Sequence, residues 1–409
     1  MSLTERLLAA LPAAATASAA QARERFVEFG LPNSRVESWR YSALRGLESL
    51  DPTAADTAPF AAAQLDGLSG TLAALIGGSW QTMSALPPGL GLAIAPSAGL
   101  RAPSELALNM PADSASAFAL LNLAGAAAGL DLIVDAPVLG IWGLSLQHET
   151  NGLLQVDNRI RVHSGGAITL LEHWTGADQA GGLLNTLLDI ELETDSELTL
   201  IRVQELGSKA QAMQTTTVRC ADRARFNLVT LELGGLWTRH DVSVDLNKAG
   251  ASANVTGLVA LQGRQHHDTQ LALRHLAGAA QSRTLWKAVA NQRARSVFNG
   301  LIRVAPGADL TEAHLKTANL LLSAHAEIDT KPELVIEADE VVCSHGATVG
   351  QLDDRALFYL RSRGIPEAQA RQILTLAFGG EVLAAIADSS LRAALSARVN
   401  AHLPQTFAE

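Results

Sequence analysis

A turn residue recurs about every 28 positions through the middle of the chain, and this interval limits the possible folds more than any other feature. The turns lie between pairs of strand-like apolar runs, at intervals of 29, 27, 28, 28, 29 and 31 residues; the markers are Gly166, Asp195, Asp222, Gly250, Gly278, Gly307 and Ala338. A strand-rich unit of this length cannot bury its apolar face alone, whereas stacked units share one continuous core. The interval therefore predicts a parallel β-solenoid.

The main alternative is a β-sandwich built from hairpins. A sandwich would place turn signals every 8–12 residues, without a longer period. Few Asn-Gly or Asp-Gly hairpin turns occur, and Asn151-Gly152 is one of them. The solenoid explains the spacing better.

Three zones that differ in composition and hydrophobic pattern indicate the domain organisation. Residues 1–130 are rich in alanine, with short helical patterns that proline and glycine interrupt, and we expect a mainly helical N-terminal region. Residues 131–350 carry the repeat and form the β-helix core. Residues 351–409 return to a helical pattern, in which Leu391, Leu395 and Val399 recur at helical spacing. This C-terminal stripe either packs on the end of the solenoid or docks a partner.

Composition excludes several classes of protein. The 409 residues include 41 acidic and 31 basic side chains, so the net charge of −10 argues against a nucleic-acid-binding surface and against attachment to anionic membranes. No apolar run reaches 18 residues, which argues against a membrane span. With only two cysteines, a reducing compartment is expected. Glu5 lies where an export signal would be basic, so we predict a short helix at the start of the chain and a cytoplasmic protein.

The segment around Cys343 and His345 is the main candidate for chemistry. On a strand these two side chains point to the same face, with Cα atoms roughly 6.5–7 Å apart. A thiol and an imidazole can both bind a soft or borderline metal ion. Two ligands do not complete a tetrahedral site, so the others would come from elsewhere in the chain, from a partner or from a cofactor. The alternative is an ordinary strand cysteine beside a surface histidine.

The remaining histidines and the second cysteine give weaker signals. His266 and His267 are adjacent, so on a strand they face opposite ways and do not share an ion. His314 and His325 could approach each other or His345 across neighbouring coils. Cys220 is isolated and is expected to be a small buried hydrophobe. The chain contains no phosphate-binding Gly-x-x-x-x-Gly-Lys loop, no Gly-x-Ser-x-Gly elbow and no His-Glu-x-x-His motif, so any nucleotide hydrolysis would have to come from a partner.

Ordered motifs in the C-terminal half resemble those of one family. They are Asn319-Leu320-Leu321-Leu322-Ser323, Pro332-Glu333-Leu334-Val335-Ile336-Glu337-Ala338-Asp339, Cys343-Ser344-His345-Gly346-Ala347-Thr348-Val349-Gly350 and Phe358-Tyr359-Leu360-Arg361-Ser362-Arg363-Gly364. This run resembles the SufB/SufD family of iron–sulfur cluster assembly proteins. Near the start, Glu37-Ser38-Trp39-Arg40-Tyr41-Ser42 resembles a motif of the SufD branch.

The resemblance implies a right-handed parallel β-helix between helical N-terminal and C-terminal regions. It also implies a cytosolic complex of SufB, SufD and two copies of the ATPase SufC. SufB and SufD would pair through their β-helices, and the isolated chain could form a homodimer. SufC would dock on the C-terminal helices, for which the expected contact residues are Phe358, Tyr359, Arg361, Arg363, Ile373, Leu374 and Phe378.

The resemblance further implies a role in cluster assembly without catalysis. A nascent iron–sulfur cluster would form transiently between SufB and SufD, with His345 as the preferred ligand in this chain and Cys343 as a second candidate. No residue here can be assigned to a flavin. One alternative is a purely structural partner of SufB. The other is a carbohydrate-active solenoid enzyme that uses the acidic residues around Glu337 or Asp353, although only 4% of residues are aromatic.

Overall fold

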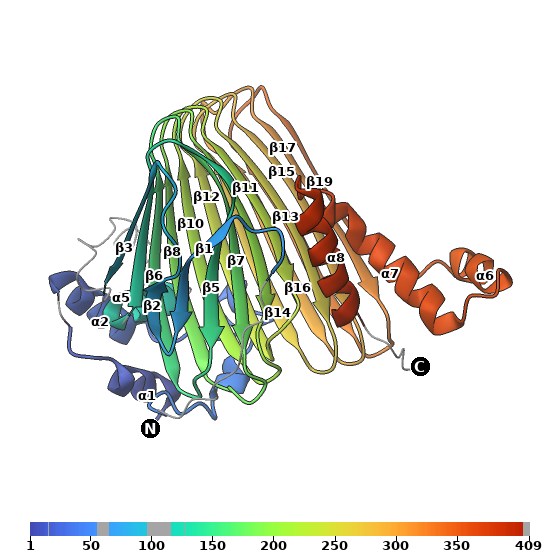
Figure 1. Ribbon diagram of the computed structural model, residues 1–409, viewed down its shortest axis with the longest axis horizontal. Helices are drawn as coiled ribbons and strands as arrows, with labels where there is room; N and C mark the ends of the chain where they lie inside the picture. Colours follow the sequence, from blue (N-terminus) through green and yellow to red (C-terminus); the bar gives the residue numbers. More distant parts are fainter. Residues whose placement is uncertain (15, 55–64, 96–115, 127, 404–409) are drawn as a thin grey trace.

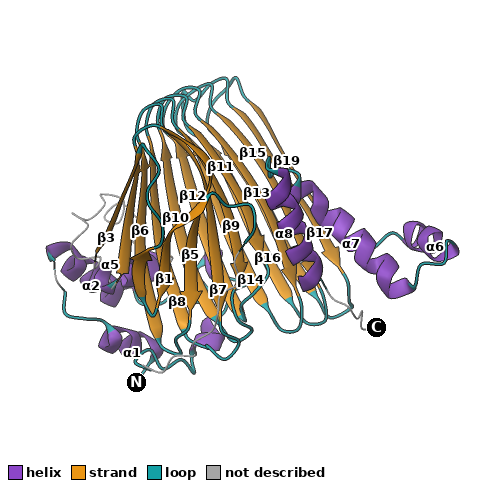
Figure 2. Ribbon diagram, in the orientation of Figure 1, coloured by secondary structure: helices purple, strands orange, loops and turns teal. Residues whose placement is uncertain are grey.

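The structure is a computed structural model that describes residues 1–14, 16–54, 65–95, 116–126 and 128–403. Its centre is a β-solenoid of about eight turns, in which two broad sheets face each other across one core (Figure 1). Helices lie toward both ends of the chain (Figure 2). The predicted mainly β fold, a solenoid with helical flanks, is therefore confirmed.

Successive strands of the solenoid alternate between the two sheets. Among the described residues, the ten-stranded sheet runs in the order β19 (Val342–Gly350), β17 (Glu312–Leu321), β15 (Gln281–Ala290), β13 (Ser252–Leu261), β11 (Arg225–Glu232), β9 (Glu197–Glu205), β7 (Ala167–Gly176), β5 (Pro137–His148), β1 (Gly70–Ile76), β2 (Ser79–Thr82). The nine-stranded sheet runs in the order β18 (Glu327–Ile336), β16 (Arg295–Val304), β14 (His266–His275), β12 (Trp237–Leu246), β10 (Gln211–Cys220), β8 (Leu183–Leu192), β6 (Leu153–Val162), β4 (Ala128–Val134), β3 (Leu90–Ala95).

Parallel, in-register pairing stacks like residues in columns through the core. One column of the nine-stranded sheet is aliphatic in every coil: Leu132, Ile160, Ile190, Val218, Val244, Leu273, Ile302, Leu334. All but the last are buried. Burial of a side chain of this size stabilises the fold by about 1.5–3 kcal/mol, so each coil depends on its neighbour to cover its apolar face.

A left-handed residue at one corner of the coils explains the 28-residue interval. Gly165, Asp195, Arg223, Gly250, Ala279 and Leu310 all have φ between +51° and +74°. The amide of Asp195 donates to the carbonyl of Asp222 in the next coil (2.9 Å), and Ala279 donates to Asp309 in the same way (2.8 Å). Five of the turn markers predicted from the sequence lie at or next to these residues: Gly166, Asp195, Asp222, Gly250 and Gly278. Gly307 is itself left-handed (φ +76°), and Ala338 lies in the turn between Ile336 and Val342.

The two ends of the solenoid are finished differently. At the first end, β2 pairs antiparallel with β1, and β3 pairs antiparallel with β4. Residues 1–130 thus contribute three strands as well as helices. At the other end, β18 and β19 each have a neighbour on one side only, among the described residues. The last coil therefore exposes both an apolar end and unpaired strand edges.

Most of the described helices pack on the outer faces of the sheets. The N-terminal elements pack on the nine-stranded sheet: α1 (Leu3–Ala10), α2 (Ala17–Phe29), the 3-10 turns η1 (Glu37–Trp39) and η2 (Leu44–Leu47), and α5 (Ala117–Gly125). The C-terminal elements are α6 (Asp354–Ser362), α7 (Glu367–Leu383) and α8 (Ser389–His402). The short helix predicted at the start is present as α1, with Leu7 buried. In the described part of the chain, no helix is both long and apolar enough to cross a membrane.

One layer of the core is polar, which the apolar repeat does not predict. Arg202 forms a buried ion pair with Glu232 and lies 3.1 Å from His240 Nε2. Its guanidinium also stacks over Trp174, 5.2 Å from the ring centroid. Burial raises the pKa of nearby Glu172 to about 6. Inside the solenoid these charges must satisfy one another, because an unpaired buried charge is costly.

The buried histidines give the fold a pH dependence. Burial lowers the pKa of His148 and His275 to about 4. The stability that each contributes is fully present above pH 6.5 and is lost as the pH falls toward 4, because only the unfolded chain binds the proton in that window. Each proton changes the free energy of unfolding by about 1.4 kcal/mol per pH unit. Glu172 and Asp241, with pKa values raised to about 6, offset part of this slope.

We predict that His275→Gln flattens the dependence of unfolding free energy on pH by about one proton between pH 4.5 and 6.5. Urea unfolding at a series of pH values measures the slope. His325→Gln, in the exposed turn before β18, is the matched control. A slope equal to that of the wild type would contradict the role assigned to the buried His275.

Candidate functional site

The open end of the solenoid is the most unusual surface of the molecule. Large apolar side chains of β18 and β19 are exposed there: Val335 (42%), Ile336 (42%), Val342 (64%) and Val349 (48%). Parallel sheets are normally buried, and an exposed apolar strand edge pairs readily with another chain. This end therefore has the properties of an interface.

Cys343 and His345 lie on β19 at this open end. Cys343 pairs with Ala313 of the preceding coil, and His345 pairs with Leu315. Ala313 and Leu315 are 0% and 2% exposed, because both face the core. The cysteine and the histidine therefore continue two core-facing columns into the last coil, and they share one face of the strand as expected.

The environments of the two side chains differ. Cys343 is partly buried against the core, and this burial raises the pKa of its thiol. A metal ion would have to displace the thiol proton. His345 is exposed. Within the described residues no group of three His, Cys, Asp or Glu could hold a metal ion. The pair therefore offers at most half of a site, as the ligand count from the sequence indicated.

The other histidines do not complete this pair. His314 pairs in register with Ser344, so its side chain lies on the opposite face of the sheet from His345, and its Nδ1 is 2.7 Å from Ser344 Oγ. His325 lies in the turn before β18. The approach of these histidines to His345 that the sequence suggested does not produce a metal-binding group among the described residues.

His266, His267 and Cys220 behave as the sequence predicts. His266 faces the N-terminal region and lies 3.0 Å from Ser42 Oγ, whereas His267 faces the core between Thr238 and Thr269. The adjacent histidines thus point to opposite sides. Cys220 is fully buried, and burial raises the pKa of its thiol to about 12, which makes it inert.

The C-terminal helices form a second distinctive surface. Helix α6 projects away from the solenoid and lies against α7 (Figure 1). It exposes Phe358 (73%) and Tyr359 (58%). The guanidinium of Arg363 lies 5.2 Å from the ring centroid of Tyr359, and Arg361 pairs with Glu367 (3.3 Å). Exposed aromatic and arginine side chains on a projecting helix are typical of a protein-binding surface.

The stripe of α8 packs within the chain. Leu391, Leu395 and Val399 are at most 1% exposed, in an apolar cluster with strands of the ten-stranded sheet. They cover the outer side of that sheet, not the end of the solenoid, and are not free to dock a partner (Figure 2). The stripe therefore packs within the chain, as one of the two alternatives predicted. It packs on the outer face of a sheet, however, and not on the end of the solenoid.

Polar contacts hold α7 and α8 against the solenoid at two points, and neither contact was predicted from the sequence. Lys287 of β15 is nearly buried, and its Nζ lies 2.6 Å from Glu381 Oε2 and 2.9 Å from the carbonyl of Phe378. Phe378 also stacks against Lys287, so part of its surface is used within the chain. On α8, Arg398 binds Glu205 of β9 (2.5 Å). The contacts join residues 91 or more positions apart, beyond the reach of local patterns.

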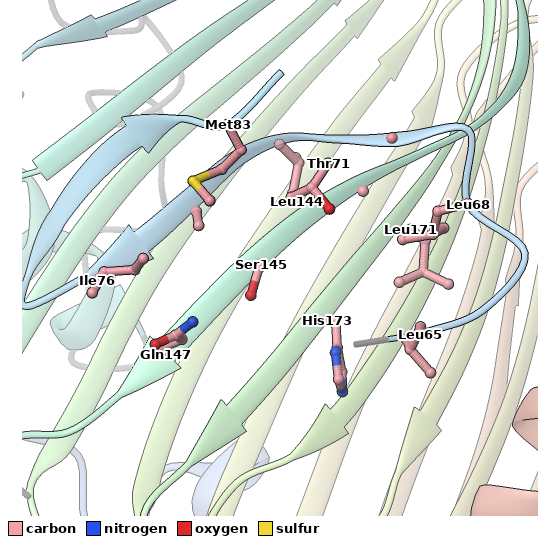
Figure 3. Close-up of a pocket in the computed structure, with 13 residues that line it drawn as sticks. Leu65, Leu68, Thr71, Ile76, Met83, Leu144, Ser145, Gln147, Leu171 and His173 are labelled. Carbon is pink, nitrogen blue, oxygen red and sulfur yellow. The ribbon is translucent and has the colours of Figure 1, made fainter. Parts of the chain in front are cut away.

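A pocket of about 310 Å³ lies on the outer side of β5 and β7, far from the open end (Figure 3). Its walls combine apolar side chains such as Met83 and Leu171 with Ser145, Gln147 and His173. The imidazole of His173 is already bound to Glu205 (2.8 Å). Two of the acidic residues considered for glycoside chemistry are also engaged: Glu337 pairs with Arg303 (3.0 Å), and Asp353 caps α6.

The comparison with known families accords with this geometry. The family described as SUF system FeS cluster assembly, SufBD core domain, matches residues 145–378, more than half of the chain. The chain belongs to the SufBD family. The match spans the solenoid from β5 to α7, including Cys343 and His345, and it confirms the resemblance inferred from the motifs.

Individual relatives support the same assignment. The iron–sulfur cluster assembly protein SufD of Escherichia coli is 33% identical over 268 residues, which are 64% of this chain and 63% of that protein. A SufBD family protein of Synechocystis is 36% identical over 59% of this chain and 54% of its own length. One of Mycobacterium tuberculosis is 27% identical over 92% of this chain and 91% of its own. The chain thus spans less than two thirds of the first two relatives.

We predict that Lys287→Met loosens α7 from the solenoid. The substitution keeps the apolar stem but removes both polar contacts, so we expect a loss of about 1–3 kcal/mol and faster hydrogen exchange of the α7 amides. Hydrogen–deuterium exchange with mass spectrometry measures this locally. Lys248→Met, in an exposed turn, is the control. Unchanged exchange in α7 would show that the apolar contacts alone hold the helix.

Proposed function

We propose that this chain is a non-catalytic scaffold subunit of a SUF iron–sulfur cluster assembly complex in the cytoplasm. It pairs with a SufB-like subunit through β18 and β19, and it binds a SufC-like ATPase through its C-terminal helices. The observation that carries the proposal is the open last coil, where a thiol and an imidazole occupy columns that hold alanine and leucine in the coil before.

In this proposal, the open end is apolar and uncovered in the isolated chain because the partner subunit covers it in the complex. A second solenoid placed against β18 and β19 would complete their backbone hydrogen bonds and bury the exposed valines. Without a SufB-like subunit, a second copy of this chain can use the same edge, so we expect a homodimer. Net negative charge makes nucleic acid and anionic membrane poor partners.

The incomplete ligand set supports a transient role at the cluster. His345 is exposed at the edge, and a ligand from the partner subunit would complete the coordination as a nascent cluster forms. A cluster shared by two subunits in this way can be released when the interface changes. His345 is the preferred ligand in this chain. The thiol of Cys343, with its raised pKa, is the weaker candidate.

The C-terminal surface suits the ATPase. Phe358, Tyr359, Arg361 and Arg363 lie on or directly after α6, away from the solenoid. Ile373 on α7 is 41% exposed, and Leu374 beside it is half-buried. Since α7 is fastened to β15 through Lys287, a displacement of α7 by the ATPase would be passed to the sheet that ends in β19.

We predict that His345→Ala leaves the complex intact but lowers anaerobic cluster content roughly tenfold or more, as loss of a metal ligand does. Co-purified complex with the SufB-like and SufC-like subunits is measured by iron and sulfide content. His314→Ala, on the opposite face of the neighbouring strand β17, is the matched control. Full cluster content in His345→Ala would leave the chain as a purely structural partner.

We also predict that Phe358→Ala weakens ATPase binding by about tenfold or more without changing the melting temperature of the isolated chain. The side chain is exposed, so its removal costs the fold little, whereas an aromatic anchor in an interface carries about 2 kcal/mol. Leu139→Ala removes an 89% exposed leucine from β5 and serves as control. Unchanged binding isotherms for Phe358→Ala would exclude α6 from the interface.

A further inference from the structure

One short segment of the N-terminal region crosses the last four strands of the nine-stranded sheet. Four of its residues each contact a different strand, and the first of them in sequence contacts the edge strand β18. Trp39 stacks with Trp237 of β12 (6.4 Å), Ser42 donates a hydrogen bond to Asp268 of β14, Tyr41 lies 5.8 Å from the guanidinium of Arg295 of β16, and Glu37 lies 2.6 Å from Lys331 of β18. We call residues 37–42 the crossing segment.

The crossing segment is fixed firmly at one side and exposed at the other. Trp39 is 1% exposed, and the guanidinium of Arg239 lies 3.8 Å from its ring centroid. Arg239 also donates to the carbonyl of Ser38 (2.7 Å). By contrast, the side chain of Glu37 is 78% exposed and Tyr41 is 39% exposed. The buried anchor thus holds two exposed side chains beside the edge strand.

A pocket of about 210 Å³ separates the exposed part of the crossing segment from the last two strands of this sheet. Its lining includes two carboxylates, Glu37 and Asp329, and two cations, Arg40 and Lys331. Asn299 also lines the pocket, and its buried Oδ1 accepts no hydrogen bond from any described residue. An acceptor in this position is satisfied when a donor enters from outside.

We propose that the crossing segment forms the rim of the subunit interface. The partner solenoid subunit that pairs with β18 also contacts Glu37 and Tyr41, and it places a hydrogen-bond donor in the pocket against Asn299. The pocket is continuous with the edge, because Asp329, Thr330 and Lys331 of β18 form one of its walls. This inference rests on the proposed function, since the occupant is the same partner subunit.

Site-specific photo-cross-linking tests the contact directly. A benzoylphenylalanine placed at Tyr41 in the complex with the SufB-like subunit should form an adduct with that subunit, whereas one at Leu139 should not. The same probe at Val349 tests β19 itself. If the probe at Val349 forms adducts and the probe at Tyr41 does not, the proposed contact of the crossing segment is wrong, whereas the proposed pairing through β19 stands. Absence of adducts at both positions, in a complex that still forms, would overturn the proposed edge pairing as well.

Asn299→Leu distinguishes a role of this side chain in the subunit interface from a role in the stability of the fold. In the isolated chain this change removes an unpartnered acceptor, so the melting temperature should stay the same or rise. In the complex it removes a hydrogen bond, so the dissociation constant for the SufB-like subunit should increase about tenfold. Asn254→Leu, on the outer face of β13, is the matched control. An unchanged dissociation constant for Asn299→Leu would contradict the donor placed in the pocket.

Discussion

Each coil of the solenoid buries the apolar end of the coil before it, and the coil that ends in β19 has no successor among the described residues. Stacking stabilises each coil through its neighbours, but a terminal coil lacks one of these neighbours. At the first end, antiparallel strands β2 and β3 close the sheets. At the last end, exposed valines and open backbone edges remain. The partner surfaces assigned to β18 and β19 follow from this asymmetry.

The same constraint explains how a core position can become a site. Ala313 and Leu315 are buried because β19 covers them. The next residues in their columns are Cys343 and His345, and no further coil of this chain covers these. One coil before Ala313 and Leu315 these columns hold buried Ser282 and Thr284, so they accept polar side chains, and in the uncovered last coil they hold a thiol and an imidazole. Since the described residues of this chain offer only part of a ligand set, cluster binding at the proposed site would depend on assembly with the partner subunit.

Much of the fold was predictable because it is repetitive. The interval from Gly166 to Gly278 follows from a left-handed residue at the same corner of successive coils, and strand alternation fixes the shared face of Cys343 and His345. Contacts between distant segments were not predictable. Glu37 meets Lys331 across 294 residues, and α8 lies along a sheet face because Leu391 and Val399 complete an apolar cluster there. Local patterns predict that such apolar stripes are buried, but they do not identify the surface against which the stripes pack.

The central claim is that the open edge is completed by a partner subunit. Hydrogen–deuterium exchange of the outward-facing amides of β19 tests it most directly, with the chain measured alone as a dilute monomer and then bound to the SufB-like subunit. We expect these amides to exchange rapidly in the monomer and to become protected in the complex, while the amides of β9 stay protected in both. Rapid exchange of β19 in the fully formed complex would contradict the account.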